Sequence, residues 1–193
     1  MSVASRVAEA VRHLIEKDYE SAMIAVCVAL DATAGREFPQ FATISGAGKR
    51  CTAFMNKNLD IITAVGFGGA ICSAPGSTLN LKTPGSSNRL EALEKIIYKT
   101  LRCTLLHEAS LPEKVVFTED AFYGERDGHF YIPVPMIYAL LLAVIGASSN
   151  SGCQIPGDLR IRIRGKDLAV NELWGKADDI RKHLGISPSQ DVR

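Results

Sequence analysis

The sequence predicts a mainly α-helical protein, built as a helical bundle with a small β-hairpin and a short C-terminal extension of strand and helix. Apolar residues recur at helical spacing in several segments, and strand-like patterns are confined to short stretches. The longest apolar run, residues 134–147, is typical of a buried helix. With 193 residues, of which 47% are hydrophobic and 22% charged, the chain is long enough to bury one core.

The N-terminal part predicts three helices. The first repeats its apolar residues at helical spacing, at Val3, Val7, Val11 and Leu14. Asp18 is placed to cap a second helix from about Tyr19, and so short a connection predicts antiparallel packing. The second helix, "AMIAVCVALDATA", is apolar on every face, so we expect it to be the most buried element. After Pro39, a third helix is predicted over residues 47–58.

The middle of the chain predicts a long loop, a helix and a hairpin. Residues 66–88 are rich in Gly, Ser and Pro, which is typical of a loop. Helical spacing then returns, at Leu90, Leu93, Ile97, Leu101 and Leu105. Pro112 prevents this helix from continuing. "KVVFTE" and "HFYIPV" flank the turn-rich stretch "DAFYGERDG", and we expect these two segments to pair as a hairpin.

The C-terminal part predicts a buried helix and an extension. The helix begins near Pro135 and is shorter than the roughly 20 residues that span a bilayer. "GASSNSG" is interpreted as a linker, "LRIRIRG" as a strand, residues 165–167 as a turn and residues 171–184 as an amphipathic helix. We therefore expect a helical bundle at residues 1–150 and an extension at residues 151–193 that packs on it within one globular unit.

Composition argues against several classes of protein. The formal net charge of +1 gives no overall attraction to nucleic acid or to a membrane. The N-terminus mixes charges into its apolar positions, unlike a signal peptide. Five widely spaced cysteines without a Cys-x2-Cys pair suit a reducing cytoplasm better than a disulfide framework or a zinc site. We expect a cytoplasmic protein with no membrane segment, no cofactor and no bound metal.

Two glycine-containing stretches resemble nucleotide-binding motifs but lack their defining residues. In "TISGAGKR", Thr43 stands where a phosphate-binding loop has its first glycine, and Arg50 stands where that loop has Ser or Thr. Gly66, Gly68 and Gly69 do not follow a strand of a βαβ unit. We interpret the first stretch as a helix entry built from small residues, and we expect no nucleotide site in either.

Three alternating arginines form a candidate RNA-binding stripe. Arg160, Arg162 and Arg164 alternate with isoleucines, so a strand would place the three guanidinium groups on one face. Such a face could contact the phosphates of RNA. It could also be the exposed face of an edge strand, where charges discourage aggregation, and we favour this second interpretation.

Asp31 is the single charge within the apolar second helix. A carboxylate in such a place is usually paired with an arginine or caps a backbone group. A supporting role in a catalytic site is the alternative. His13, His129 and His183 stand alone without metal-ligand spacing, so we interpret them as surface residues.

The segment "TLRCTLLHEASLP" holds the residue pair that most directly indicates a function. Arg102 and His107 lie about 140° apart around the predicted helix, opposite its leucine stripe, with Cys103 and Leu106 on the same side. A monomer would normally make such a face polar, so its partly apolar centre indicates that something covers it. A second copy of the same helix is an economical candidate. In a two-fold contact, Arg102 of one chain would approach His107 of the other.

These residues resemble the HEPN group, small all-helical proteins that include many prokaryotic toxins and RNA-cleaving defence proteins. The hallmark of that group is an Arg-x4-6-His motif late in a helix, matched here by Arg102 and His107 in "RCTLLHE". The stretch "LIEKDYESAMIAVCVALDATA" is similar to the opening helix pair of the group, with its short Asp-Tyr turn. The resemblance covers about residues 3–150.

The resemblance implies a metal-independent endoribonuclease that acts as a homodimer. His107 would transfer protons at the attacking ribose 2′-hydroxyl or at the leaving oxygen, since the usual histidine pKa of about 6.5 suits both roles. Arg102 would bind the scissile phosphate and stabilise the charge that develops on it. Glu108 would either orient His107 or simply occupy a helix end.

Cys103 leaves a second interpretation open. Many active members have a polar residue, often asparagine, directly after the arginine, and inactive members survive as helical binding modules. The chain could then be a catalytically silent regulator or antitoxin that binds a protein or nucleic-acid partner. Catalysis requires Arg102 and His107 to face a solvent-reachable cleft, which separates the two interpretations. A small-molecule enzyme with residues 66–88 as a lid has no supporting residue cluster.

Overall fold

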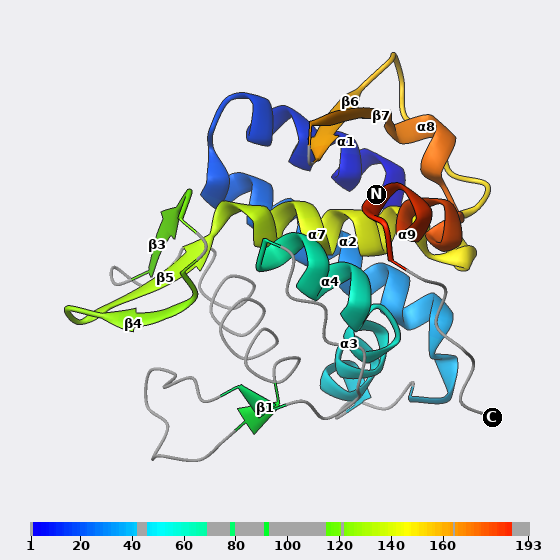
Figure 1. The fold of residues 1–193 in the computed structure, drawn as a ribbon. Helices are drawn as coiled ribbons and strands as arrows, with labels where there is room; N and C mark the ends of the chain where they lie inside the picture. Colours follow the sequence, from blue (N-terminus) through cyan, green and yellow to red (C-terminus); the bar gives the residue numbers. More distant parts are fainter. Residues whose placement is uncertain are drawn as a thin grey trace.

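The computed structural model describes residues 2–41, 46–68, 78–79, 91–92, 115–120, 122–163 and 165–186. Over these residues the fold is mainly α-helical, as predicted (Figure 1). The helices are α1 (Val3–Ile15), α2 (Tyr19–Glu37), η1 (Pro39–Phe41), α3 (Gly46–Lys57), α4 (Leu59–Gly66), α7 (Val134–Gly146), η3 (Ser148–Asn150), α8 (Val170–Leu173) and α9 (Ala177–Leu184). The strands are β1 (Thr78–Leu79), β2 (Glu91–Ala92), β3 (Val115–Thr118), β4 (Gly124–Arg126), β5 (His129–Pro133), β6 (Arg160–Ile163) and β7 (Lys166–Ala169).

Helices α1 and α2 form the predicted antiparallel pair. The Ser2 hydroxyl accepts a hydrogen bond from the Ser5 N–H at 3.1 Å, and the Ser5 hydroxyl accepts one from the Ser2 N–H, which makes a capping box for α1. The Asp18 carboxylate accepts a hydrogen bond from the Ser21 N–H at 3.2 Å, so Asp18 caps α2 as predicted. Between the two helices Lys17 takes a φ of 60°, and the chain turns back at once.

Helix α2 is not the most buried helix in the described part of the chain, which corrects the prediction: all residues of the short helix α4 are buried, and the longer helix α7 is almost as completely buried. Every residue of α7 except Pro135 and Tyr138 is buried. Neighbours cover α7 on nearly every side, because it crosses the centre of the molecule in contact with α1, α2, α4, α8 and α9 (Figure 1). Helix α2 instead leaves Glu20 and Arg36 exposed. Among the described residues no helix, α7 included, has the length and apolarity needed to cross a membrane.

The three-stranded sheet pairs its strands differently from the predicted hairpin. Strands β3 and β5, from "KVVFTE" and "HFYIPV", lie parallel, and β4 pairs antiparallel with the other edge of β5. The cause is a two-residue turn at Asp127 and Gly128, whose φ values of 53° and 74° suit an Asp-Gly hairpin. This turn places Arg126 opposite His129, so β4 forms the hairpin with β5. The predicted pairing is therefore wrong, although the two predicted strands exist.

Two short strands differ from the structure predicted for the middle of the chain. Strand β1 pairs antiparallel with β2, with Thr78 opposite Ala92. The predicted loop over residues 66–88 thus contains a strand, and the predicted start of the next helix contains another. The rest of that predicted helix, residues 93–107, lies outside the described residues.

The C-terminal extension forms the hairpin β6–β7 and two short helices. Ile163 pairs with Lys166, so the turn lies between them. It includes Gly165, as predicted, whereas Lys166 and Asp167 belong to β7 and not to the turn. The predicted helix over residues 171–184 is divided into α8 and α9 at Gly175, whose φ of 72° belongs to the left-handed region that favours glycine. Helix α9 then packs on α7 and α4.

The stretch "GASSNSG" is a packed corner and not the predicted linker. Asn150 within it is 0% exposed. Its Nδ2 donates to Thr33 Oγ1 at 3.0 Å and to the Val144 carbonyl at 2.8 Å, and its Oδ1 accepts from Arg36 Nη1 at 3.1 Å. Because Thr33 and Arg36 belong to α2 and Val144 belongs to α7, one side chain joins the C-terminal ends of the two helices. We call this group the Asn150 junction.

We predict that Asn150→Ala lowers the free energy of unfolding by about 2–4 kcal/mol, because it leaves buried groups of α2 and α7 without hydrogen-bond partners. Denaturant unfolding followed by circular dichroism measures the change. Gln154→Ala, at an exposed position nearby, is the control and should change the free energy by less than about 0.5 kcal/mol. An Asn150→Ala effect as small as that of the control would contradict the structural role of the junction.

Candidate functional site

The predicted catalytic pair lies outside the described residues. Arg102 and His107 belong to that part of the chain, and so do the supporting residues Cys103 and Glu108. Their roles therefore stay predictions, and the site described below is built from other residues.

Asp31, the third predicted supporting residue, lies half-buried on α2. Cys51, which is 0% exposed on α3, places its Sγ 3.4 Å from Asp31 Oδ1 as a thiol donor. This contact links α2 to α3. The Asp31 side chain is therefore only partly buried, although the helix around it is apolar. The Cys51 thiol is one of the groups that its carboxylate contacts.

The arginine stripe has the predicted alternation where it is described. Arg160 and Arg162 are exposed on β6, and the isoleucines between and after them are buried. Arg160 Nη1 lies 3.3 Å from Asp158 Oδ2, and Arg162 Nε lies 3.2 Å from Asp167 Oδ1. Such exposed ion pairs contribute little to the stability of the fold, and each arginine can exchange its carboxylate for another anion. Arg164 lies outside the described residues.

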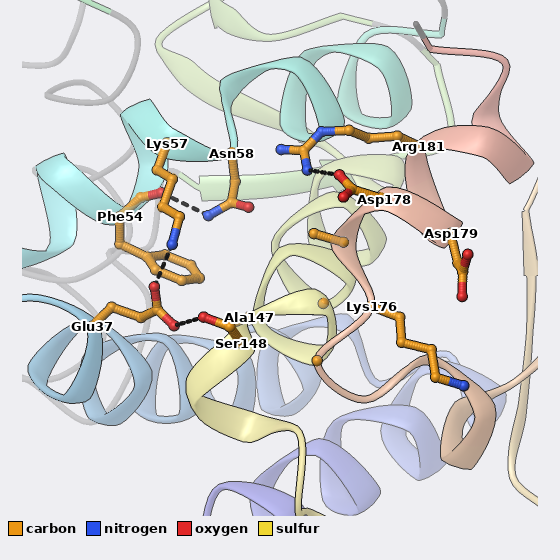
Figure 2. Close-up of a pocket in the computed structure, with 13 residues that line it drawn as sticks. Glu37, Phe54, Lys57, Asn58, Ala147, Ser148, Lys176, Asp178, Asp179 and Arg181 are labelled. Atoms are coloured by element: carbon orange, nitrogen blue, oxygen red, sulfur yellow. Dashed lines mark hydrogen bonds and ion pairs between the residues drawn. The ribbon is translucent and has the colours of Figure 1, made fainter. Parts of the chain in front are cut away.

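A polar cleft of about 410 Å³ opens where several helices end or begin (Figure 2). The ends of α2, α3 and α7 form one side of it, and the entry into α9 forms the other. We call it the junction cleft, because Ser148 of the corner that holds Asn150 lines it. Its lining residues are Glu37, Phe54, Lys57, Asn58, Gly146, Ala147, Ser148, Gly175, Lys176, Ala177, Asp178, Asp179 and Arg181.

Glu37 is the buried anion of the junction cleft, with its side chain 6% exposed. Lys57 Nζ donates to its Oε2 at 2.5 Å, while the Ser148 hydroxyl and the Ser149 N–H donate to Oε1 at 3.0 and 2.9 Å. Burial raises the pKa of Glu37, but these hydrogen bonds and the charge of Lys57 outweigh burial and lower the pKa to about 2. Glu37 is therefore ionised at neutral pH and connects the end of α2 to α3 and η3.

Arg181 is the buried cation at the opposite side of the cleft, 9% exposed. Its Nε donates to Asp60 Oδ2 at 2.6 Å, and its Nη1 donates to Asp178 Oδ1 at 3.1 Å. Burial lowers the pKa of Arg181, but the hydrogen bond and charge of Asp60, followed by those of Asp178, outweigh burial and raise it. Because Asp60 belongs to α4, this ion pair connects α9 to α4.

Two glycines allow the walls of the cleft to approach each other. A Cβ on Gly146 would lie 3.1 Å from the Ala177 Cα and 2.9 Å from the Ile180 side chain. A Cβ on Gly175 would lie 2.7 Å from the Ser151 Cα, and the Gly175 N–H donates to the Ile145 carbonyl at 2.9 Å. The entry into α9 is thereby held directly against the end of α7.

The chemistry of the lining residues suits binding better than nucleophilic catalysis. The residues that line the cleft include no histidine or cysteine, and the Ser148 hydroxyl donates its hydrogen bond to Glu37. Within the described ranges, no group of three or more His, Cys, Asp or Glu side chains could hold a metal ion. The cleft therefore offers hydrogen-bond acceptors and fixed charges.

Sequence reasoning missed this cleft because its parts are far apart in the chain. Ser148 is separated from Glu37 by 111 residues and Arg181 from Asp60 by 121 residues, so no local spacing reveals either contact. The only local signals are irregularities, namely the polar corner "GASSNSG" after a long apolar helix and Gly175 inside a predicted helix. In the sequence alone, the polar corner is interpreted as a linker and Gly175 as part of a helix, so neither feature indicates a cleft.

Comparisons with known proteins give a family and no activity. The family model Rv1289 matches residues 2–193 of the chain. The uncharacterized protein Rv1289 of Mycobacterium tuberculosis and the uncharacterized protein Mb1320 of Mycobacterium bovis are each 22% identical over 191 residues, which cover 96% of this chain and 89% of theirs. No solved structure matches the chain. The names of these relatives specify no function that could be carried over.

We predict that Glu37 makes stability depend on pH. Its pKa is about 2 in the folded protein, compared with the ordinary value of 4.5 that the unfolded chain retains. A lowered folded pKa stabilises the protein above the unfolded value and loses that contribution as pH falls from about 4.5 to about 2. The full contribution is about 3 kcal/mol.

Unfolding free energies of the parent and Glu37→Gln, measured from pH 7 to pH 2, test this prediction. The parent should be the more stable protein at pH 7, and the difference should shrink below about pH 4.5. Glu172→Gln, which removes an exposed carboxylate from α8, is the control and should preserve the pH dependence of the parent. A difference between the parent and Glu37→Gln that is constant across this range would contradict the assignment.

Proposed function

The chain belongs to the Rv1289 family, and we propose that this member is a metal-independent endoribonuclease of the HEPN type that acts as a homodimer, with a toxin or defence role. The observation that carries the proposal is the Arg102-x4-His107 motif at the end of an apolar helical pattern. His107 transfers protons during attack by the ribose 2′-hydroxyl, and Arg102 binds the phosphate that is cleaved.

The described fold supports the proposal at the level of architecture. The HEPN group is all-helical and opens with a helix pair joined by an Asp-Tyr turn. Here α1 and α2 form such a pair, with Asp18 as the cap and Tyr19 as the first residue of α2. The mainly α-helical fold is the kind of scaffold that the proposed activity requires.

The homodimer follows from the spacing of the pair. On a helix, Arg102 and His107 are about 140° apart and cannot easily act on one phosphate from the same chain. A two-fold contact between two copies of the helix brings Arg102 of one copy to His107 of the other. Each dimer then has two equivalent sites.

The exposed arginines of β6 supply contacts to RNA beyond the cleaved phosphate. Arg160 and Arg162 have their guanidinium groups at the surface, and their carboxylate partners are also exposed. An RNA phosphate can therefore replace Asp158 or Asp167 at small cost. Arg164 completes the stripe in the sequence.

We predict that the purified protein cleaves RNA in EDTA and that Arg102→Ala and His107→Ala each reduce cleavage at least about 100-fold, because each removes a group that acts on the reacting phosphate or its protons. Total RNA and structured tRNA are the substrates, and the products are separated on denaturing gels. Arg126→Ala and His183→Ala, at exposed positions, are the matched controls and should keep the parent rate.

Circular dichroism and sedimentation must first show that all variants are folded and equally oligomeric. Loss of cleavage in both motif variants supports the proposal. If no RNA is cut by the parent or by any variant, the nuclease proposal fails and the alternative of a silent binding or regulatory protein is favoured.

We predict a separate effect on RNA affinity for a variant in which Arg160, Arg162 and Arg164 are all replaced by Gln. Each lost phosphate contact lowers the slope of log K against log salt by about 0.7, so the slope should fall by about 2. Filter binding of single-stranded RNA to a His107→Ala background, at several salt concentrations, measures it. Lys17→Gln with Lys182→Gln should leave the slope nearly unchanged, and an equal effect there would contradict a specific stripe.

A further inference from the structure

We draw no further inference here: the strongest candidate, the surface patch that Phe122, Arg126, His129 and Tyr131 form on the sheet β3–β5–β4, carries none, because these side chains already contact one another and nothing in the described part of the structure shows what covers them.

Discussion

The arrangement of the helices depends on the hydrogen bonds that the buried side chain of Asn150 makes to α2 and α7. Helix α7 is buried on nearly every side, so hydrophobic contact alone does not determine its rotation or its register along α2. Hydrogen bonds are directional, and those from Asn150 to Thr33 of α2 and to the Val144 carbonyl of α7 determine both. A single buried polar residue thus gives a uniformly apolar helix one defined position.

The junction cleft is a consequence of this arrangement. Once α2 and α7 end side by side, Glu37 lies next to Ser148 and Ser149, and Lys57 closes the group from α3. Gly175 then allows the chain to enter α9 directly against this end of the bundle. Glu37 and Arg181, the buried charges of the cleft, are already hydrogen-bonded to other protein groups, which leaves few lining groups available to a ligand.

Much of the helical part of the fold could be predicted from the sequence, because helix periodicity and caps are local signals. Asp18 and the apolar run over residues 134–147, with a predicted start near Pro135, each identify a helix start to within a residue. The strand pairing could not be predicted in the same way, since the Asp-Gly turn at residues 127–128 lies within a longer stretch that is rich in turn residues. The cleft depends on contacts across more than 100 residues, such as Ser148 with Glu37, which no local pattern encodes.

Native-state hydrogen exchange is the measurement that most directly tests whether the Asn150 junction is part of the cooperative core. The Asn150 N–H donates to the Ala147 carbonyl and the Gly175 N–H to the Ile145 carbonyl, each at 2.9 Å. If the junction holds the helices together, both amides exchange with the same opening free energy as the amide of Leu142 in the middle of α7. If both exchange through an opening that costs several kcal/mol less than that of Leu142, the junction opens independently and does not determine the helix arrangement.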